Sequence, residues 1–247
     1  MLEQLTSFLN VVSPSLHAPF AEGVPETIQF IQSAVQWAAI VLTALAGVAE
    51  ARRRDLDYFG ALVIAFVVSV GGGTLRDVLL SRYPLFWVTS PVYLVTVLIV
   101  ATIGTFIIAQ GEKQVPAIEP LVNPMRSLMR SDHIPHWVIV VDALGLGLWA
   151  YLGTAFALES SSTSLIVAPV FGVITASFGG VIRDVFFAQT PSIFKRGQLY
   201  ATSAALGSVV YVILFSLGAE TTVSFVLCVG VTFLVRMAAV RFNILSM

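Results

Sequence analysis

The sequence predicts an all-α membrane protein in which seven transmembrane helices form an inverted repeat of two three-helix units, followed by a seventh helix. Three observations predict this fold class: a very apolar composition, apolar stretches of bilayer length, and a duplicated motif. Of the 247 residues, 57% are hydrophobic and only 11% are charged, whereas a soluble domain carries about 25% charged residues. So few charges cannot cover a globule in water, and lipid is the expected surrounding medium.

Apolar stretches recur along the chain with short polar breaks between them. Each is close to the ~20 residues that an α-helix needs to cross the hydrocarbon core of a bilayer. The seven predicted spans are 31–50, 58–80, 92–110, 137–158, 165–187, 199–217 and 221–240.

The basic residues outside the spans predict the orientation, because cytoplasmic loops hold an excess of Lys and Arg. Nine of them lie on one side of the predicted topology, against Arg82 alone on the other. The nine are Arg52, Arg53, Arg54, Lys113, Arg126, Arg130, Lys195, Arg196 and Arg241. We therefore expect a multi-pass protein of the plasma (inner) membrane, with its N-terminus outside and its C-terminus in the cytoplasm.

A duplicated motif relates the two halves of the chain. Residues 71–84 read GGGTLRDVLLSRYP, and residues 178–191 read FGGVIRDVFFAQTP. A separation of 107 residues, as from Arg76 to Arg183, aligns two glycines, an Arg-Asp-Val triplet and the final proline. Since three helices per unit make successive units enter the membrane from opposite faces, the repeat is predicted to be inverted.

The duplication extends upstream of the motif, because Gly47 matches Gly153 at a separation of 106 residues. The whole preceding helix is therefore expected to be duplicated. The predicted parts are an extracytoplasmic N-terminal segment (1–30), repeat 1 (31–110), a cytoplasmic loop (111–136), repeat 2 (137–217), and the seventh helix with a cytoplasmic tail (218–247).

Glycines gather inside predicted spans 2 and 5, and each costs a helix about 1 kcal/mol relative to alanine. They are Gly71, Gly72, Gly73, Gly179 and Gly180. We expect both helices to be broken at these glycines, with the freed backbone groups facing water or protein. The alternative is that small residues let two helices pack closely.

An Arg-Asp pair follows the glycines in each copy of the motif. An Arg or Asp at the centre of a transmembrane helix costs about 2.5–3.5 kcal/mol on insertion scales, so it should face a partner or a water cavity. Because neighbours on a helix do not face each other, cross-repeat pairs are expected: Arg76 with Asp184, and Arg183 with Asp77. The alternative places these side chains near the interface, where they reach the headgroups.

Other polar residues in the spans have two open interpretations. Asp142, near the start of span 4, is expected either in the polar cavity or at the membrane interface. The Thr74 hydroxyl can line an ion path or bond to its own helix backbone. Glu50 and Glu159 end predicted helices and are expected to be solvated.

The chain lacks sequence patterns of an enzyme: it has no P-loop, no H-E-x-x-H and no G-x-S-x-G. Residues 145–150 fit a G-x-G-x-x-A dinucleotide pattern, but they lie in an apolar span with no soluble strand before them. Cys228 is the single cysteine, and the three histidines lack metal-ligand spacing. A basic patch for nucleic acid is missing too. We therefore expect no enzyme activity, metal site, cofactor or nucleic-acid partner.

With both G-G-x-x-R-D-V segments in view, the sequence resembles the prokaryotic branch of the trimeric intracellular cation channel family, also grouped as a glycine-transporter-like domain. The resemblance covers residues 31–240. It implies seven helices, a homotrimer, and one pore in each protomer between the kinked helices at 58–80 and 165–187. It also implies permeation of monovalent cations, chiefly potassium. Phe178 departs from the motif because Gly71 holds that place in the first copy, and the Lys-Glu pair of the eukaryotic branch is missing, so phosphoinositide regulation is not implied.

The expected function is therefore a potassium-permeable cation channel, embedded in membrane lipid as a homotrimer. Its expected pathway residues are Gly71, Gly72, Gly73, Thr74, Arg76, Asp77, Asp142, Gly179, Gly180, Arg183 and Asp184. The two arginines would repel cations unless the aspartates neutralise them. The alternative is a secondary carrier for a small zwitterion such as glycine, because half-helix N-termini suit a carboxylate and backbone carbonyls suit an amine.

Overall fold

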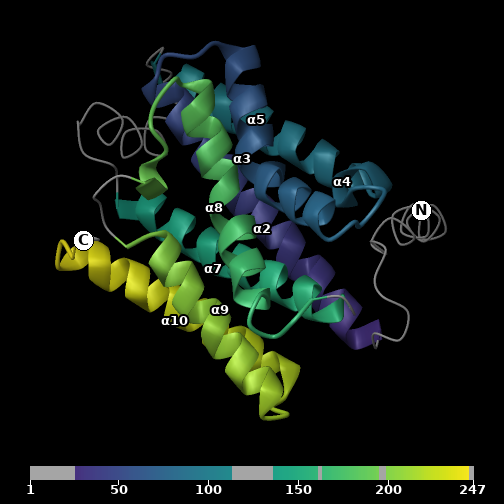
Figure 1. The fold of residues 1–247 in the computed structure, drawn as a ribbon. Coiled ribbons are helices and arrows are strands. Elements are labelled where there is room, and N and C mark those ends of the chain that lie inside the picture. Colours follow the sequence, from purple (N-terminus) through teal and green to yellow (C-terminus); the bar gives the residue numbers. More distant parts are fainter. Residues whose placement is uncertain (1–25, 113–135, 161–162, 195–198, 245–247) are drawn as a thin grey trace, which may run out of the picture.

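The computed structural model describes residues 26–112, 136–160, 163–194 and 199–244, and helices dominate these ranges (Figure 1). The elements are α2 (Glu26–Arg53), α3 (Tyr58–Leu79), α4 (Phe86–Thr89), α5 (Pro91–Glu112), α7 (His136–Glu159), α8 (Ala168–Phe186), the 3-10 helix η3 (Ser192–Phe194), α9 (Ala201–Ser216) and α10 (Thr221–Arg241). Most of the predicted 1–30 segment and of the 111–136 loop lies outside the described residues, as do Lys113, Arg126, Arg130, Lys195 and Arg196.

The all-α, multi-pass fold class predicted from the sequence is confirmed, since each predicted span coincides with one long helix. Five of these helices, α2, α3, α7, α8 and α10, are long and apolar enough to cross a membrane. The other two predicted spans coincide with shorter apolar helical stretches, Pro91–Ile107 of α5 and Ala201–Ser216 of α9. The largest difference at a boundary is in α2, which begins at residue 26 rather than 31.

The helices pack as two similar three-helix units. α2, α3 and α5 contact one another, and α7, α8 and α9 do the same. The units meet where α3 packs on α8 and where α2 packs on α7, while α10 covers α7 and α9. In Figure 1, α5 lies on one side of this bundle and the α9–α10 pair lies on the other. The packing is that of an inverted repeat with one added helix.

The turns that end α3 and α8 are copies of each other. After α3, the N–H of Arg82 donates to the carbonyl of Asp77 at 2.8 Å; after α8, the N–H of Gln189 donates to the carbonyl of Asp184 at 2.9 Å. In each turn the residue before the donor has a left-handed backbone, with φ of 54° and 51°. Such a turn satisfies the last carbonyls of a helix. The duplication read from the sequence therefore extends to backbone hydrogen bonds.

The predicted breaks at the glycines are wrong, because α3 and α8 continue as α-helices through both motifs. The glycines serve the alternative role of close packing. A Cβ added to Gly72 would overlap the carbonyl oxygen of Thr175 and lie 2.9 Å from its carbonyl carbon. A Cβ added to Gly179 would meet Val68 in the same way, 3.1 Å from that carbonyl carbon. These two contacts are equivalent under the repeat, so α3 and α8 cross backbone to backbone about a pseudo-twofold axis.

The matched glycines upstream of the motifs have the same packing role within each repeat. A Cβ on Gly47 of α2 would lie 2.8 Å from the Cα of Ala65 on α3. A Cβ on Gly153 of α7 would overlap the carbonyl oxygen of Phe171 on α8. Small residues thus let the first two helices of each repeat approach closely, as they do in many membrane proteins.

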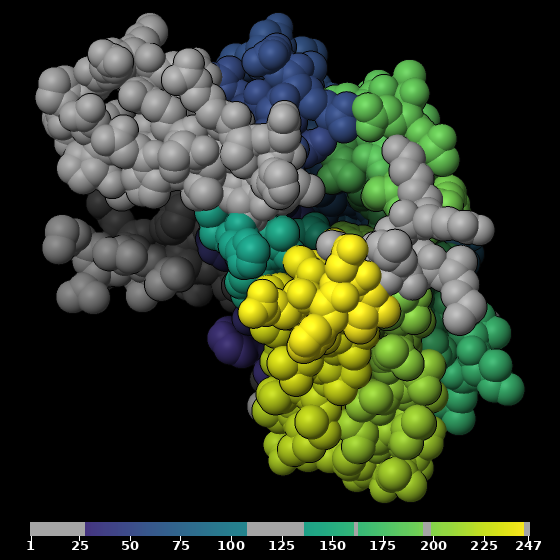
Figure 2. Space-filling model, turned by 90° about the vertical axis from the view of Figure 1, so that its left-hand side faces the viewer, coloured from purple at the N-terminus to yellow at the C-terminus, as the bar shows by residue number. Residues whose placement is uncertain are grey.

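The surface of the helical bundle carries large apolar side chains. Figure 2 shows α9 and α10 side by side along the lower part of one face. Exposed residues on these helices include Ile213, Phe215, Val226 and Leu234. Apolar surface on this scale suits contact with lipid acyl chains or with another apolar surface.

Candidate functional site

Each motif arginine pairs with the aspartate beside it, so the predicted cross-repeat pairs are wrong. Nη2 of Arg76 lies 2.7 Å from Oδ1 of Asp77, and Nη2 of Arg183 lies 2.8 Å from Oδ1 of Asp184. The Nε atoms donate to the same carboxylate oxygens at 2.9 Å. A long arginine side chain can bend back to its neighbour, although the two Cβ atoms point in different directions.

The direction of the helices explains why cross-repeat pairs do not form. α3 and α8 run antiparallel, and the contacts of Gly72 and Gly179 place their crossing near residues 70 and 177. At 1.5 Å per helical residue, Arg76 and Arg183 lie ~9 Å beyond the crossing in opposite directions. The motif therefore forms two separate polar clusters. We call these two regions the Arg76 end and the Arg183 end of the bundle.

Each aspartate also fixes the chain that follows its helix. Oδ2 of Asp77 accepts from the backbone N–H of Phe86 at 3.1 Å, and Oδ2 of Asp184 accepts from that of Ser192 at 2.7 Å. One carboxylate thus binds the guanidinium and holds the returning loop. Charge-assisted bonds of this kind are about twice as strong as neutral ones.

A cavity of about 440 Å³ opens at the Arg183 end. Its lining residues come from α2, α7, α8, the segment after α8, and α10; of these, Ser177 of α8 lies level with the α3–α8 crossing. Among the described residues, its charged lining consists of Glu50, Asp142, Asp184, Arg53, Arg54, Arg183 and Arg236. Three carboxylates therefore face four guanidinium groups in a space large enough for a hydrated ion or a small organic solute.

Most charges in the cavity have partners within the protein. Arg54 donates to Oε1 of Glu50 at 2.9 Å. Asp142 accepts from the hydroxyl of Tyr200 at 3.2 Å, and the guanidinium of Arg236 lies 5.0 Å from the centre of the Tyr200 ring. Of the two alternatives for Asp142, the structure therefore places it at the polar cavity, where α10 supplies a positive charge.

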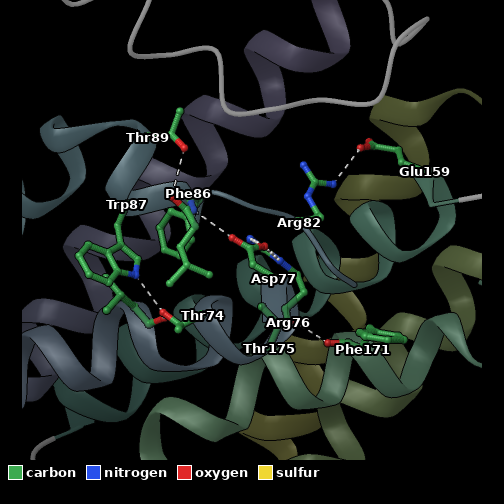
Figure 3. A network of polar contacts seen from close by, with 12 residues as sticks. Thr74, Arg76, Asp77, Arg82, Phe86, Trp87, Thr89, Glu159, Phe171 and Thr175 are labelled. Carbon is green, nitrogen blue, oxygen red and sulfur yellow. Dashed lines mark hydrogen bonds and ion pairs between the residues drawn. The ribbon is translucent and has the colours of Figure 1, made fainter. Parts of the chain in front are cut away.

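The charged pair at the Arg76 end is buried, and Figure 3 shows it together with Arg82 and Glu159. The side chains of Arg76 and Asp77 are only 1% and 3% exposed. The ring of Phe156 contacts two guanidinium groups, and its centre is 4.4 Å from that of Arg76 and 4.3 Å from that of Arg82. Arg82 in turn lies 3.7 Å from Oε2 of Glu159. The result is a cluster of two guanidinium groups, one aromatic ring and two carboxylates, buried at Arg76 and Asp77 and partly buried at Arg82 and Glu159.

The groups of this cluster shift the pKa of the Arg82 guanidinium in opposite directions. Burial lowers the pKa of the Arg82 guanidinium, and the charge of Arg76 lowers it further, while Asp77 and Glu159 raise it. The two carboxylates therefore stabilise the Arg82 charge, which burial disfavours.

The sequence-predicted site residues divide between these regions. Gly180, Arg183, Asp184 and Asp142 border the cavity. The others, Gly71, Gly72, Gly73, Thr74, Arg76, Asp77 and Gly179, lie at the crossing or at the Arg76 end. The Thr74 hydroxyl donates to the Val70 carbonyl at 2.8 Å and accepts from Nε1 of Trp87 at 3.0 Å. Of its two interpretations, the structure therefore shows the bond to its own helix backbone.

Several residues of the site were missed from sequence. Glu159 was expected to be solvated, but its side chain is only 14% exposed and bonds Gln32 as well as Arg82. Phe156 gives no signal in an apolar span. Arg236 could have been identified from the sequence, because a charge inside predicted span 221–240 needs a polar partner.

The fold and the cavity define a multi-pass helical membrane protein of inverted-repeat design. A sequence model of the glycine transporter family matches residues 33–109 and again residues 139–216, so one description fits both halves. The UPF0126 inner membrane protein YadS of Escherichia coli is 34% identical over 217 residues, which is 85% of this chain and 93% of that protein. A UPF0126 membrane protein of Vibrio cholerae is 30% identical over 81% of this chain and 75% of its own length. The chain belongs to the glycine transporter (UPF0126) family.

Solved structures of trimeric intracellular cation channels share this fold. The orthologue from Rhodobacter sphaeroides superposes with a TM-score of 0.70 at 29% identity, covering 87% of this chain and 99% of the channel. A second structure, described as the basis for conductance through these channels, gives a TM-score of 0.71 at 28% identity and covers 87% and 95%. The resemblance read from the motif is therefore confirmed, and these neighbours are channels rather than enzymes.

Proposed function

We propose that the protein is a cation channel, permeable to potassium, with a pathway through each protomer along the α3–α8 pair. Ions enter the cavity at the Arg183 end and pass the crossing toward the Arg76 end. The channel assembles as a homotrimer in the plasma membrane, as the neighbouring channels named above are trimeric.

The observation that carries this proposal is the cavity lined by Asp142 and Asp184, which borders α8 at one end of the α3–α8 pair. Carboxylates and hydroxyls of this kind can replace part of the hydration shell of a cation. The main objection was repulsion by the motif arginines. It is answered by the pairing of each arginine with its own aspartate, which leaves each motif nearly neutral.

We propose that the Arg183 end faces the cytoplasm. Arg53 and Arg54, two of the nine basic residues that set the predicted orientation, border the cavity at this end. The N-terminus is then outside and the C-terminus inside.

The experiment that tests the proposal is current recording from purified protein in planar bilayers under a potassium chloride gradient. We expect unitary steps whose current reverses near the potassium equilibrium potential. Reversal near the chloride potential, or the absence of steps from protein of proven fold, contradicts a cation channel.

A carrier for a small zwitterion is the second candidate, because the cavity is far larger than one cation and holds more guanidinium groups than carboxylates. A guanidinium binds the carboxylate of such a solute and a side-chain carboxylate binds its amine. Counterflow separates the two candidates. Internal unlabelled glycine accelerates uptake of labelled glycine through a carrier, and a channel shows no such exchange.

A further inference from the structure

The two ends of the α3–α8 pair are built from the same motif but differ in their access to solvent. At the Arg183 end the arginine side chain is 22% exposed and borders the cavity. At the Arg76 end the equivalent side chain is 1% exposed. Because the sequence motif and the backbone turn are duplicated, the difference must come from what covers each pair.

The cover at the Arg76 end comes from two sides: Phe86 of α4, whose ring centre is 5.6 Å from the Arg76 guanidinium, and the last turn of α7. Phe156 and Glu159 are three residues apart and therefore share one face of that helix. Phe156 lies over Arg76, and Glu159 pairs with Arg82 in the loop after α3. Figure 3 shows Arg82 reaching from its loop to Glu159 above the Arg76–Asp77 pair. We call Arg82, Phe156 and Glu159 the latch.

The latch joins the two repeats, since Arg82 follows α3 of repeat 1 and Glu159 ends α7 of repeat 2. A related contact occurs at the other end, where Nη2 of Arg54 at the end of α2 donates to Oε1 of Gln189 after α8 at 2.9 Å. Gln189 occupies the position 107 residues after Arg82. The contact at the Arg183 end is exposed and pairs a charge with a neutral amide, whereas the latch pairs two charges under cover.

The latch is also the part of the Arg76 cluster that can open at the lowest cost. The Arg82 and Glu159 side chains already retain 15% and 14% exposure, so separating them exposes two charges that are only partly buried. The Arg76–Asp77 pair has almost no exposure, and separating it would leave buried charges unpaired. Relative movement of the repeats would break the first pair and keep the second.

We propose that the latch is the closed gate of the pathway at the Arg76 end, and that the structure holds a state open toward the Arg183 end only. This inference rests on the proposed channel function. The gate opens when the last turn of α7 moves away from the loop after α3, which uncovers Arg76 and Asp77.

The test is Glu159→Gln, which removes one charge of the latch. Loss of about 1 kcal/mol of pairing corresponds to roughly a fivefold rise in open probability. Hydrogen exchange at the last turn of α7 should accelerate as well. The matched control is Glu220→Gln, the same change at an exposed residue before α10, and it should alter neither measurement.

A second variant tests the gate from the closed side. In a Cys228→Ala background, Arg82→Cys with Glu159→Cys is joined by a short bifunctional thiosulfonate. We expect loss of current that returns on reduction. Unchanged open probability in Glu159→Gln, or full current in the cross-linked protein, overturns the gate. Wild-type current is recorded first, so failure of the channel proposal appears in the wild type and failure of the gate only in the variants.

Discussion

Gly72→Ala is expected to destabilise the folded protein by about 3 kcal/mol or more, at the upper end of the cost of overpacking. The added Cβ would overlap the carbonyl oxygen of Thr175 on the facing helix. A helix carbonyl cannot turn aside as a flexible side chain can, so α3 and α8 must separate. Thermal unfolding of the purified protein in detergent measures the effect, and Gly179→Ala should match it because its contact with Val68 is equivalent.

Gly180→Ala is the matched control within the same motif. The one atom near its added Cβ is Nη2 of Arg183 at 3.7 Å, an ordinary contact. We expect unfolding close to that of the wild type. If Gly72→Ala unfolded at the same temperature as the wild type, the backbone-to-backbone crossing would be wrong. Loss of current in a Gly72 variant would not locate the pore, since the fold itself is expected to fail.

Asp77→Asn should destabilise the protein by about 3–5 kcal/mol, the typical cost of leaving one partner of a buried ion pair alone. Arg76 is 1% exposed, and no water replaces the lost charge. Asp184→Asn should cost clearly less, because Arg183 borders the cavity and its side chain is 22% exposed. The difference in unfolding temperature between the two variants is the measurement.

A charge exchange gives the sharper form of this test. The double variant Asp77→Arg with Arg183→Asp would restore stability if the two positions were in contact. Their places on opposite sides of the crossing put them ~20 Å apart along the helix axes. We therefore expect no recovery, and a clear recovery would show that the antiparallel arrangement is wrong.

The sequence alone predicted two features of the fold correctly: the membrane-spanning helices and the internal duplication. Apolar length predicted the spans, and a separation of 107 residues predicted the duplication that the α3 and α8 turns confirm. The charge pair in each motif was correctly expected to need a partner. These predictions rest on local composition and on internal comparison, both of which a single sequence supplies.

The errors came from contacts between distant segments. A run of glycines is compatible with a broken helix and with a close crossing, and the facing carbonyls of Thr175 and Val68 decide between them. The predicted partner of Arg76 was wrong because the two motifs lie on opposite sides of the helix crossing, which the sequence does not show. The latch joins residues 82 and 159, which are both near helix ends and whose contact no periodicity encodes.

The charged residue in the last helix is a different case. Arg236 lies in an apolar stretch, and the cost of an intramembrane charge could have indicated that α10 faces a polar cavity. Its partner surface, formed by Tyr200 and Asp142, still required the fold.

Cations that follow the proposed pathway cross the cavity at the Arg183 end, so closing that cavity should stop the current. Gly180→Cys in a Cys228→Ala background places a thiol where the cavity borders α8. A trimethylammonium thiosulfonate is expected to abolish most of the potassium current of this variant. The same reagent should leave Val185→Cys unaffected, since Val185 is 62% exposed on the outer surface of the same helix. Full potassium current through Gly180→Cys, after mass spectrometry has proved complete modification, would show that cations cross the protein by another route.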